Sequence, residues 1–270
     1  MRFINLRPDR GTSLLLALLP FVLVVVAYVI GSAERLAENP ADKLLPSLST
    51  LAETTIRVAF TADARTGDYM LLTDTLASLE RLVSALAIAT ATALVLGMLI
   101  GLLPVMNAFL AGFVAMVSMV PPLAILPILF IVMGLGEASK IALIVIGVAP
   151  FLTRDLAMRV RELPREQLIK AQTLGASTWQ IAVRIVLPQI LPRLIDGLRL
   201  SLGPAFLFLI AAEAIAADAG LGYRIFLVRR YLAMDVILPY VAWITLLSVG
   251  MDYGFARLRD AAFPWFGGAK

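Results

Sequence analysis

The sequence contains no histidine and no cysteine, and only 16% of its 270 residues are charged. His–Cys metal sites, HExxH metalloprotease centres and Ser–His catalytic pairs all need an imidazole or a thiolate, so the chain can form none of them. Disulfide bonds are excluded because there is no cysteine. A GxxxxGK[ST] phosphate-binding loop is also absent, so the usual cradle for ATP is missing. No catalytic residue, metal or cofactor is therefore expected in this chain.

Apolar residues, by contrast, are in excess: they make up 60% of the sequence and give a mean hydropathy of +0.91. A soluble domain of this length is about half apolar and about a quarter charged. The apolar residues are also collected into blocks rather than spread evenly. This pattern indicates an all-α integral membrane protein. The net charge of +4 is then attributed to cytoplasmic loops rather than to nucleic-acid binding.

Six blocks are long enough to cross a bilayer, which needs about 20 mainly apolar residues. The first is interpreted as an uncleaved span, because its apolar run is too long for a signal peptide and no small-residue cleavage pattern follows. The third contains Pro121 and Pro122, which must bend or break it, so it is either one bent span or a span followed by a shorter piece. The six blocks are 13–31, 82–103, 107–134, 139–157, 197–217 and 236–256.

Basic and acidic residues predict the orientation of these spans. The segment 154–199 carries eight Lys/Arg against four Asp/Glu, whereas 32–81 carries five basic residues against eight acidic ones. With six spans, residues 1–12, the loop 158–195 and the tail 257–270 fall on one side, predicted to be the cytoplasm. The segment 32–81 is predicted to be external. The whole chain, 1–270, is predicted to be a single transmembrane domain.

The external segment has its own expected structure. Residues 44–60 are predicted to form a short amphipathic helix after Pro46, residues 61–69 a loop, and residues 74–82 the approach to the second span. A solvated outer loop with little function is the alternative interpretation.

A polar stretch, KAQTLGASTWQIAVRIVLP (170–188), interrupts the apolar pattern between the fourth and fifth spans. Glycine tolerates positive φ, so Gly175 is suited to a tight turn. We predict a short helix, a turn at Gly175 and a second helix that ends before Pro188, together forming a compact cytoplasmic projection, the knob (residues 166–187). An interfacial helix on the lipid headgroups explains the spacing equally well. The apolar positions near helical spacing are Leu168, Ala171, Leu174, Ile181, Ile185 and Val186.

The run EQLIKAQTLGASTWQIAVRIVLPQILPRLIDGLRLSLG (166–203) closely resembles the EAA loop of ABC-importer permeases. LPSLSTL (45–51), SMVPPLAILPILFIVMGLGEASKI (118–141), GLRLSLGPAFLFLIAAE (197–213) and AGLGY (219–223) extend the resemblance. Together they resemble the nitrate/sulfonate/taurine branch of the binding-protein-dependent permeases over nearly the whole chain after the first span. One difference is that Ile169-Lys170-Ala171 stands where the family usually has Glu-Ala-Ala, so a salt bridge from that acidic position is not carried over.

The resemblance implies a type I ABC-importer permease with six transmembrane helices and a coupling helix between spans four and five. In that family the coupling helix fits a groove on a cytoplasmic ATPase subunit, which would bind ATP and Mg²⁺ in place of this chain. The resemblance also implies a permease homodimer, two ATPase subunits, an external solute-binding protein and a bacterial inner-membrane location. The residues matched to the coupling element are Ala171, Leu174, Gly175, Ala176, Ser177, Ile185, Leu187 and Pro188.

Two features are candidates for the solute path or its gate. Glu213 is acidic within an apolar run, which is costly and usually means that the residue is functional or paired. It is expected to pair with a base such as Lys140, to act at a gate or in the path, or to lie at a solvated outer edge. Met119, Pro121 and Pro122 are the second candidate, because prolines in a span free carbonyl groups that can line a cavity. A packing kink is the alternative there.

An ion-coupled secondary transporter is the alternative function, but such proteins show inverted repeats and several intramembrane ionisable residues. The sequence shows no convincing repeat, and Glu213 is nearly alone within the predicted spans. The solute stays open among nitrate, sulfonates, taurine, urea-like and other small solutes. Because no Lys or Arg is placed firmly inside a span, a neutral or zwitterionic solute, or recognition by the binding protein alone, is weakly favoured.

Overall fold

The computed structural model describes residues 8–40, 42–62 and 67–266, and these are helical apart from short connections and one isolated β-bridge between Ala62 and Tyr69. The predicted segments 1–12, 61–69 and 257–270 lie partly outside these residues. The helices are α1 (Arg10–Glu38), α2 (Leu48–Phe60), α3 (Met70–Leu102), α4 (Pro104–Val117), α5 (Pro122–Met133), α6 (Glu137–Arg161), α7 (Arg165–Thr173), α8 (Thr178–Ile181), the π-helical segment η2 (Ala182–Val186), α9 (Leu187–Leu200), α10 (Leu202–Ala216), α11 (Leu221–Arg229) and α12 (Met234–Ala262).

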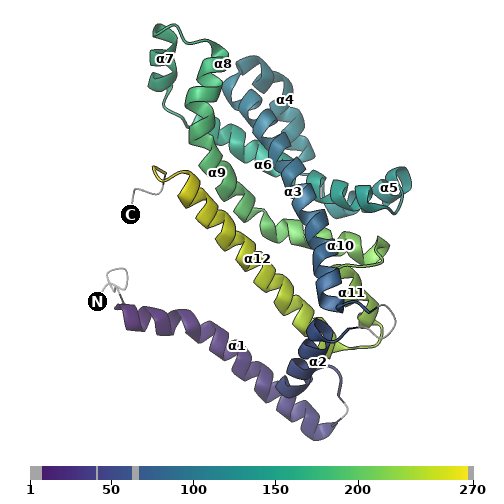
Figure 1. Cartoon of the computed structure of the whole chain (residues 1–270). Coiled ribbons are helices and arrows are strands. Elements are labelled where there is room, and N and C mark those ends of the chain that lie inside the picture. Colours follow the sequence, from purple (N-terminus) through teal and green to yellow (C-terminus); the bar gives the residue numbers. More distant parts are fainter. Residues whose placement is uncertain (1–7, 41, 63–66, 267–270) are drawn as a thin grey trace. The chain divides into compact units, whose positions relative to one another are not determined.

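The chain divides into two compact units (Figure 1). The first comprises residues up to Tyr69 together with Val228–Tyr240, and the second comprises Met70–Leu227 and the chain from Val241 onward. Helix α12 runs from the first unit into the second.

In the first unit, polar side chains of α1 contact the chain just before α2. Tyr28 Oη donates to Pro46 O at 2.6 Å, and Ser32 Oγ donates to Leu45 O at 2.9 Å. Ser47 then caps α2 by accepting a hydrogen bond from Thr50 N. The predicted amphipathic helix after Pro46 is thereby confirmed, beginning at Leu48.

The core of the second unit is built where α3 lies against α6. A small residue stands at every fourth position along one line of α3, and the two glycines of this line meet α6, where the backbones can approach closely. A Cβ added at Gly101 would lie 2.5 Å from Val160 Cβ, and one at Gly97 would lie 2.9 Å from Leu156 Cβ. Side chains at these two positions would therefore not fit between α3 and α6. The residues of this small-residue seam are Ala85, Ala89, Ala93, Gly97 and Gly101.

The described residues contain four helices long and apolar enough to cross a membrane, namely α1, α3, α6 and α12. Two bent pairs, α4 with α5 and α8–α9 with α10, raise the number to six if each pair is one span. The fold is thus the all-helical arrangement that the sequence predicts, with six spans when the bent pairs are included.

The third predicted span is a broken one. Helices α4 and α5 meet at 94° across residues 118–121. Neither Pro121 nor Pro122 has a backbone N–H, and each disfavours a helical conformation at the residue before it, so α4 cannot continue through them. The Pro121–Pro122 pair therefore separates two helices instead of kinking one.

Candidate functional site

The knob is a helical hairpin whose turn is stabilised by its own backbone. Gly175 follows α7 with φ +80°, and its N–H donates to Gln172 O at 2.9 Å. The next amide, Ala176 N, donates to Ala171 O at 3.0 Å. These two bonds form a Schellman motif, which ends a helix at a left-handed residue that is usually glycine. The predicted turn at Gly175 is confirmed.

The second half of the knob begins at a capping box. Ser177 Oγ accepts from Gln180 N at 3.3 Å, while Gln180 Oε1 accepts from Ser177 N at 2.8 Å. Both ends of the turn are therefore hydrogen-bonded, and Gly175 itself has no atom within 4 Å of the position that a Cβ would occupy. The turn is thus held by hydrogen bonds on both sides, with open space beside Gly175.

The second helix does not end before Pro188, so that prediction is wrong. The chain continues from α8 through η2 and into α9, which contains both Pro188 and Pro192 and ends at Leu200. Leu187 N donates to Ala182 O, five residues back, so the helix widens by one residue just before the proline. A π turn at this point accommodates a residue that lacks an N–H and crowds the preceding turn.

The knob buries one set of its apolar side chains and exposes another. Ala171 and Ile181 are buried, whereas Leu174 and Trp179 are 79% and 75% exposed, and Ile169 is also exposed. A hydrogen bond of 3.1 Å from Gln189 Nε2 to Gln167 Oε1 joins α9 to α7. The hairpin thus packs through one side and presents large apolar side chains near its turn on the other.

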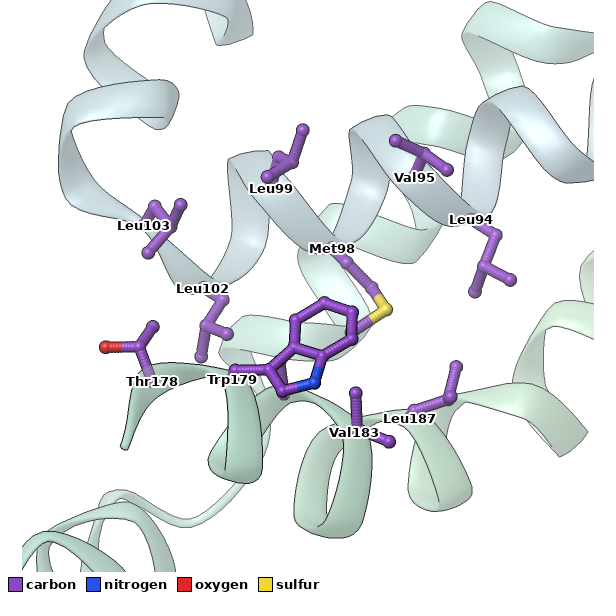
Figure 2. A pocket seen from close by; sticks show the side chains of 11 residues that line it. Leu94, Val95, Met98, Leu99, Leu102, Leu103, Thr178, Trp179, Val183 and Leu187 are labelled. Atoms are coloured by element: carbon purple, nitrogen blue, oxygen red, sulfur yellow. The ribbon is translucent and has the colours of Figure 1, made fainter. Parts of the chain in front are cut away.

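An apolar pocket of about 520 Å³ lies beside Trp179, between the end of α3 and the segment from α8 to α9. In Figure 2 the Trp179 ring and the Met98 side chain point toward each other across it. Its lining comes from the knob, from the start of α9 and from the end of α3, and is almost entirely apolar. The pocket is lined by Leu94, Val95, Met98, Leu99, Leu102, Leu103, Thr178, Trp179, Ala182, Val183 and Leu187.

Glu213, the first path candidate, is fully buried in α10 and paired with a base. Its carboxylate accepts hydrogen bonds from Arg81 Nη1 at 2.7 Å, Ser78 Oγ at 2.7 Å and Gly222 N at 2.8 Å. Pairing of Glu213 with a base is as predicted, but the suggested base, Lys140, is wrong. A role for Glu213 in a gate or path stays a prediction.

Lys140 instead forms an ion pair on its own helix, α6, with a residue one turn before it. Its Nζ donates to Glu137 Oε1 at 2.8 Å, and Arg81 contacts the same carboxylate through Nε and, at 2.9 Å, through Nη2. Arg81 therefore links Glu213 of α10 to Glu137 of α6. Since Arg81 also donates to Ala219 O at 2.8 Å, it contacts three segments at once.

The same network extends to the loop after α10. Asp74, fully buried, accepts from Gly220 N at 3.0 Å and from Arg224 Nε at 2.8 Å. Ser78 Oγ accepts from Leu221 N at 2.8 Å. The acidic and basic side chains of this network are equal in number, and pairing of this kind is what makes a buried charge tolerable. We call this set the charge network: Asp74, Arg81, Glu137, Lys140, Glu213 and Arg224.

The sequence analysis missed the α3 members of the charge network. Asp74, Ser78 and Arg81 are spaced four and three residues apart, so they share one face of a helix. That spacing, placed at the start of an apolar span, is the signal that could have identified a polar face meeting Glu213. From the sequence alone, residues 74–82 are predicted only as the approach to the second span.

The second path candidate lies at the break between α4 and α5. Met119 is 73% exposed, Pro121 precedes the first residue of α5, and Pro122 is that first residue. Arg154 Nη1 of α6 donates to Ser118 Oγ in the same break at 2.9 Å. Arg154 is seven residues before the end of α6 and lies within the fourth predicted span, 139–157. The structure brings the break and this base together, and it places Glu213 in the separate charge network.

Comparison with known proteins identifies relatives over most of the chain. Residues 93–260 match the family model described as "Binding-protein-dependent transport system inner membrane component". The taurine transport system permease protein TauC of Escherichia coli is 35% identical over 71% of this chain and 70% of its own length. The bicarbonate transport system permease protein CmpB of Synechocystis is 28% identical over 73% of this chain and 71% of its own length.

A putative aliphatic sulfonates transport permease protein, SsuC of Escherichia coli, is 29% identical over 56% of this chain and 58% of its own length. Among solved structures, an inward-facing MetNI methionine ABC transporter matches with a TM-score of 0.64 and 19% identity, covering 72% of this chain and 96% of that one. At this identity the structural match supports the fold alone.

Proposed function

The chain belongs to the inner membrane components of binding-protein-dependent transport systems, and from this premise we propose that its knob docks on a separate cytoplasmic ATPase. The chain itself is the permease subunit of an ABC importer, a transport component rather than an enzyme. Docking would transmit the movement of the ATPase to α9 and α10, since the knob continues into α9 without a break.

The observation that carries this proposal is the exposed apolar side of the knob. Leu174 lies exposed beside a turn that the Schellman motif and the capping box hydrogen-bond at both ends, and Ile169 of α7 is also exposed. Large apolar side chains gathered on a polar, solvent-facing segment are typical of a contact surface. A surface that is already rigid loses little conformational entropy when it binds.

We infer that the complete importer has four membrane-associated subunits and one external protein. Two copies of this permease would form the solute path, and two ATPase subunits would bind ATP and Mg²⁺ and contact the two knobs. An external solute-binding protein would deliver the solute to the side that carries residues 32–81. The importer would lie in a bacterial inner membrane, with both termini of the permease in the cytoplasm.

We propose that the solute is small and carries an oxyanion group. The names of the relatives give taurine, aliphatic sulfonates and bicarbonate, each of which bears a sulfonate or a carbonate-type anion. Arg154 beside the helix break supports this class and replaces the weak preference for a neutral solute.

Substitution of Gly175 tests the docking proposal. Valine cannot adopt φ +80° without strain on the order of 1–3 kcal/mol, so Gly175→Val should distort the turn while leaving the spans folded. Such a change weakens docking about tenfold or more. We expect the variant to be inserted normally but to lose the ATPase in a pull-down, and transport with it.

Gly134→Val is the matched control. Gly134 has φ +78° and also has nothing within 4 Å of an added Cβ, but it lies at the end of α5. With ψ 178° as well, it lies in a region that only glycine adopts readily, so Gly134→Val imposes backbone strain away from the knob and should still retain the ATPase. Retention of the ATPase by Gly175→Val would contradict the proposal.

A further inference from the structure

We propose that Arg154 and Arg161 of α6 form a binding site for the oxyanion group of the transported solute, at the break between α4 and α5. The inference rests on the proposed function, because it assigns a solute site to a permease. It names the side chains that would select a sulfonate or a carboxylate over a neutral molecule.

The two arginines line one cavity. They are seven residues apart, two helical turns, and so lie on the same face of α6, about 10 Å apart along the axis. The cavity measures about 200 Å³, below the roughly 300–1,000 Å³ of pockets for drug-sized ligands and thus of a size for a small solute. It is lined by Ile100, Ala111, Val114, Thr153, Arg154, Ala157, Met158 and Arg161.

Neither arginine has a carboxylate partner within the described residues. Arg154 donates to Ser118 Oγ at 2.9 Å and Arg161 Nη2 donates to Asn107 Oδ1 at 2.7 Å, both neutral groups. Neutral partners orient a guanidinium without cancelling its charge, and its five N–H groups leave donors for a ligand. The fork of donors matches the geometry of an oxyanion.

The surrounding segments supply no compensating acid. Residues 82–136, which include most of α3 and all of α4 and α5, contain no charged residue. On α6 itself, Asp155 is within 3.4 Å of Arg159, and Glu162 contacts both Arg159 and Arg193. The acids at this end of α6 therefore serve other bases, and the cavity keeps a net positive charge.

The depth of Arg154 separates it from an ordinary cytoplasmic arginine. Arg161 is the last residue of α6, where basic residues are common at the cytoplasmic boundary. Arg154, an exposed residue of the single chain, lies two turns before the end of this candidate span, where a charged side chain usually faces a path or a cavity. It contacts the interrupted stretch of a broken span, and broken helices in transporters typically line the solute site.

Thiol modification tests the site without requiring transport. Because the chain has no cysteine, Met158→Cys places a single thiol in the cavity lining. The permease–ATPase complex in phosphatidylcholine vesicles is treated with the anionic 2-sulfonatoethyl methanethiosulfonate and with neutral methyl methanethiosulfonate. A positive cleft raises the local concentration of anions by about tenfold or more. We therefore expect the ratio of anionic to neutral rates to fall about tenfold when Arg154→Gln is added.

The matched control is Arg10→Gln, which removes an exposed arginine of α1 in the other unit and should leave the ratio unchanged. An equal ratio with and without Arg154→Gln overturns the inference. If the ratio no longer depends on Arg154 once phosphatidylglycerol is added to the vesicles, the site binds lipid headgroups. That result also overturns the inference.

Uptake separates this inference from the proposed function. With taurine, an aliphatic sulfonate and bicarbonate as probes, Arg154→Gln should reduce ATP-driven uptake at least tenfold while the ATPase still copurifies, and Arg154→Lys should recover part of it. Unchanged uptake in Arg154→Gln, or a wild-type importer that carries only neutral solutes, overturns the site alone. A wild-type chain that copurifies with no ATPase overturns the proposed function.

Discussion

At the scale of single residues, the charge network explains how an acidic side chain can lie fully buried in a membrane span. Glu213 receives hydrogen bonds from a guanidinium, a hydroxyl and a backbone amide, so its charge is compensated locally. Burial of a charge is costly unless it is paired and hydrogen-bonded. The network therefore fixes the ends of α3, α6 and α10 and the loop before α11 relative to one another within the second unit.

Replacing Glu213 by glutamine should destabilise the protein. The change leaves Arg81 with one carboxylate fewer and removes an acceptor of two other donors, so we expect the free energy of unfolding to fall by on the order of 3 kcal/mol. Thermal unfolding of the purified permease in detergent measures the difference. Glu80→Gln, at an exposed position on α3, is the matched control and should change little.

Two outcomes would change the interpretation of Glu213. If Glu213→Gln unfolds at the wild-type temperature but transports poorly, Glu213 acts at a gate. If both stability and transport are unchanged, the carboxylate has neither role.

At the scale of secondary-structure elements, the contact of α3 with α6 depends on the small-residue seam. Leu156 and Val160 of α6 occupy the space that side chains at Gly97 and Gly101 would need. Without a hydrophobic driving force between helices in lipid, association depends on close packing of this kind. The seam also sets the position of α6, and with it the position of Arg154 beside the broken span.

Even one added methyl group should disturb the seam. In Gly101→Ala the new Cβ would lie 2.5 Å from Val160 Cβ and 3.0 Å from Ala157 O, so α6 must shift, at a cost of about 1–3 kcal/mol. We expect a lower thermal midpoint in detergent. Gly112→Ala is the control, because its Cβ would have nothing within 4 Å and alanine favours a helix. Equal midpoints for the two variants would show that the seam does not determine the packing.

At the scale of the whole molecule, six apolar segments and an uneven distribution of basic residues predict the sidedness of the chain. When each bent pair counts as one span, an even number of spans separates the knob from each terminal segment. The knob and both terminal segments are therefore predicted to lie on the same side of the membrane. Because the chain belongs to the binding-protein-dependent permeases, an ion-coupled secondary transporter is no longer needed as an alternative function. The predicted orientation places the knob with the ATPase and the charge network at the opposite, external side.

Cysteine labelling in intact cells measures this orientation on a chain that has no native cysteine. Ser177→Cys, in the exposed turn of the knob, should resist a membrane-impermeant maleimide until the cells are permeabilised. Ser49→Cys, exposed at the start of α2, should react at once. Reaction of Ser177→Cys in intact cells would reverse the predicted topology.

The sequence by itself determined the class of protein and the positions of its helices. Apolar blocks of about 20 residues have few stable structures other than a spanning helix, because every backbone group must be hydrogen-bonded inside lipid. The turn at Gly175 also depends on nearby residues alone, because a glycine between two helical patterns favours positive φ. A bend or a break at Pro121–Pro122 also followed from the missing amides, although the choice between the two and the angle did not.

Only the tertiary structure decided which side chains meet. The partner of Glu213 is 132 residues away at Arg81, and the suggested Lys140 instead contacts Glu137, because the partner of a buried charge depends on how α3, α6 and α10 pack. Pro188 lies inside a helix because a π turn ahead of it accommodates the missing amide, which composition cannot reveal. The closeness of Arg154 to Ser118 likewise depends on the bend between α4 and α5 and on the packing of α6, although its place within the predicted span 139–157 was already visible in the sequence.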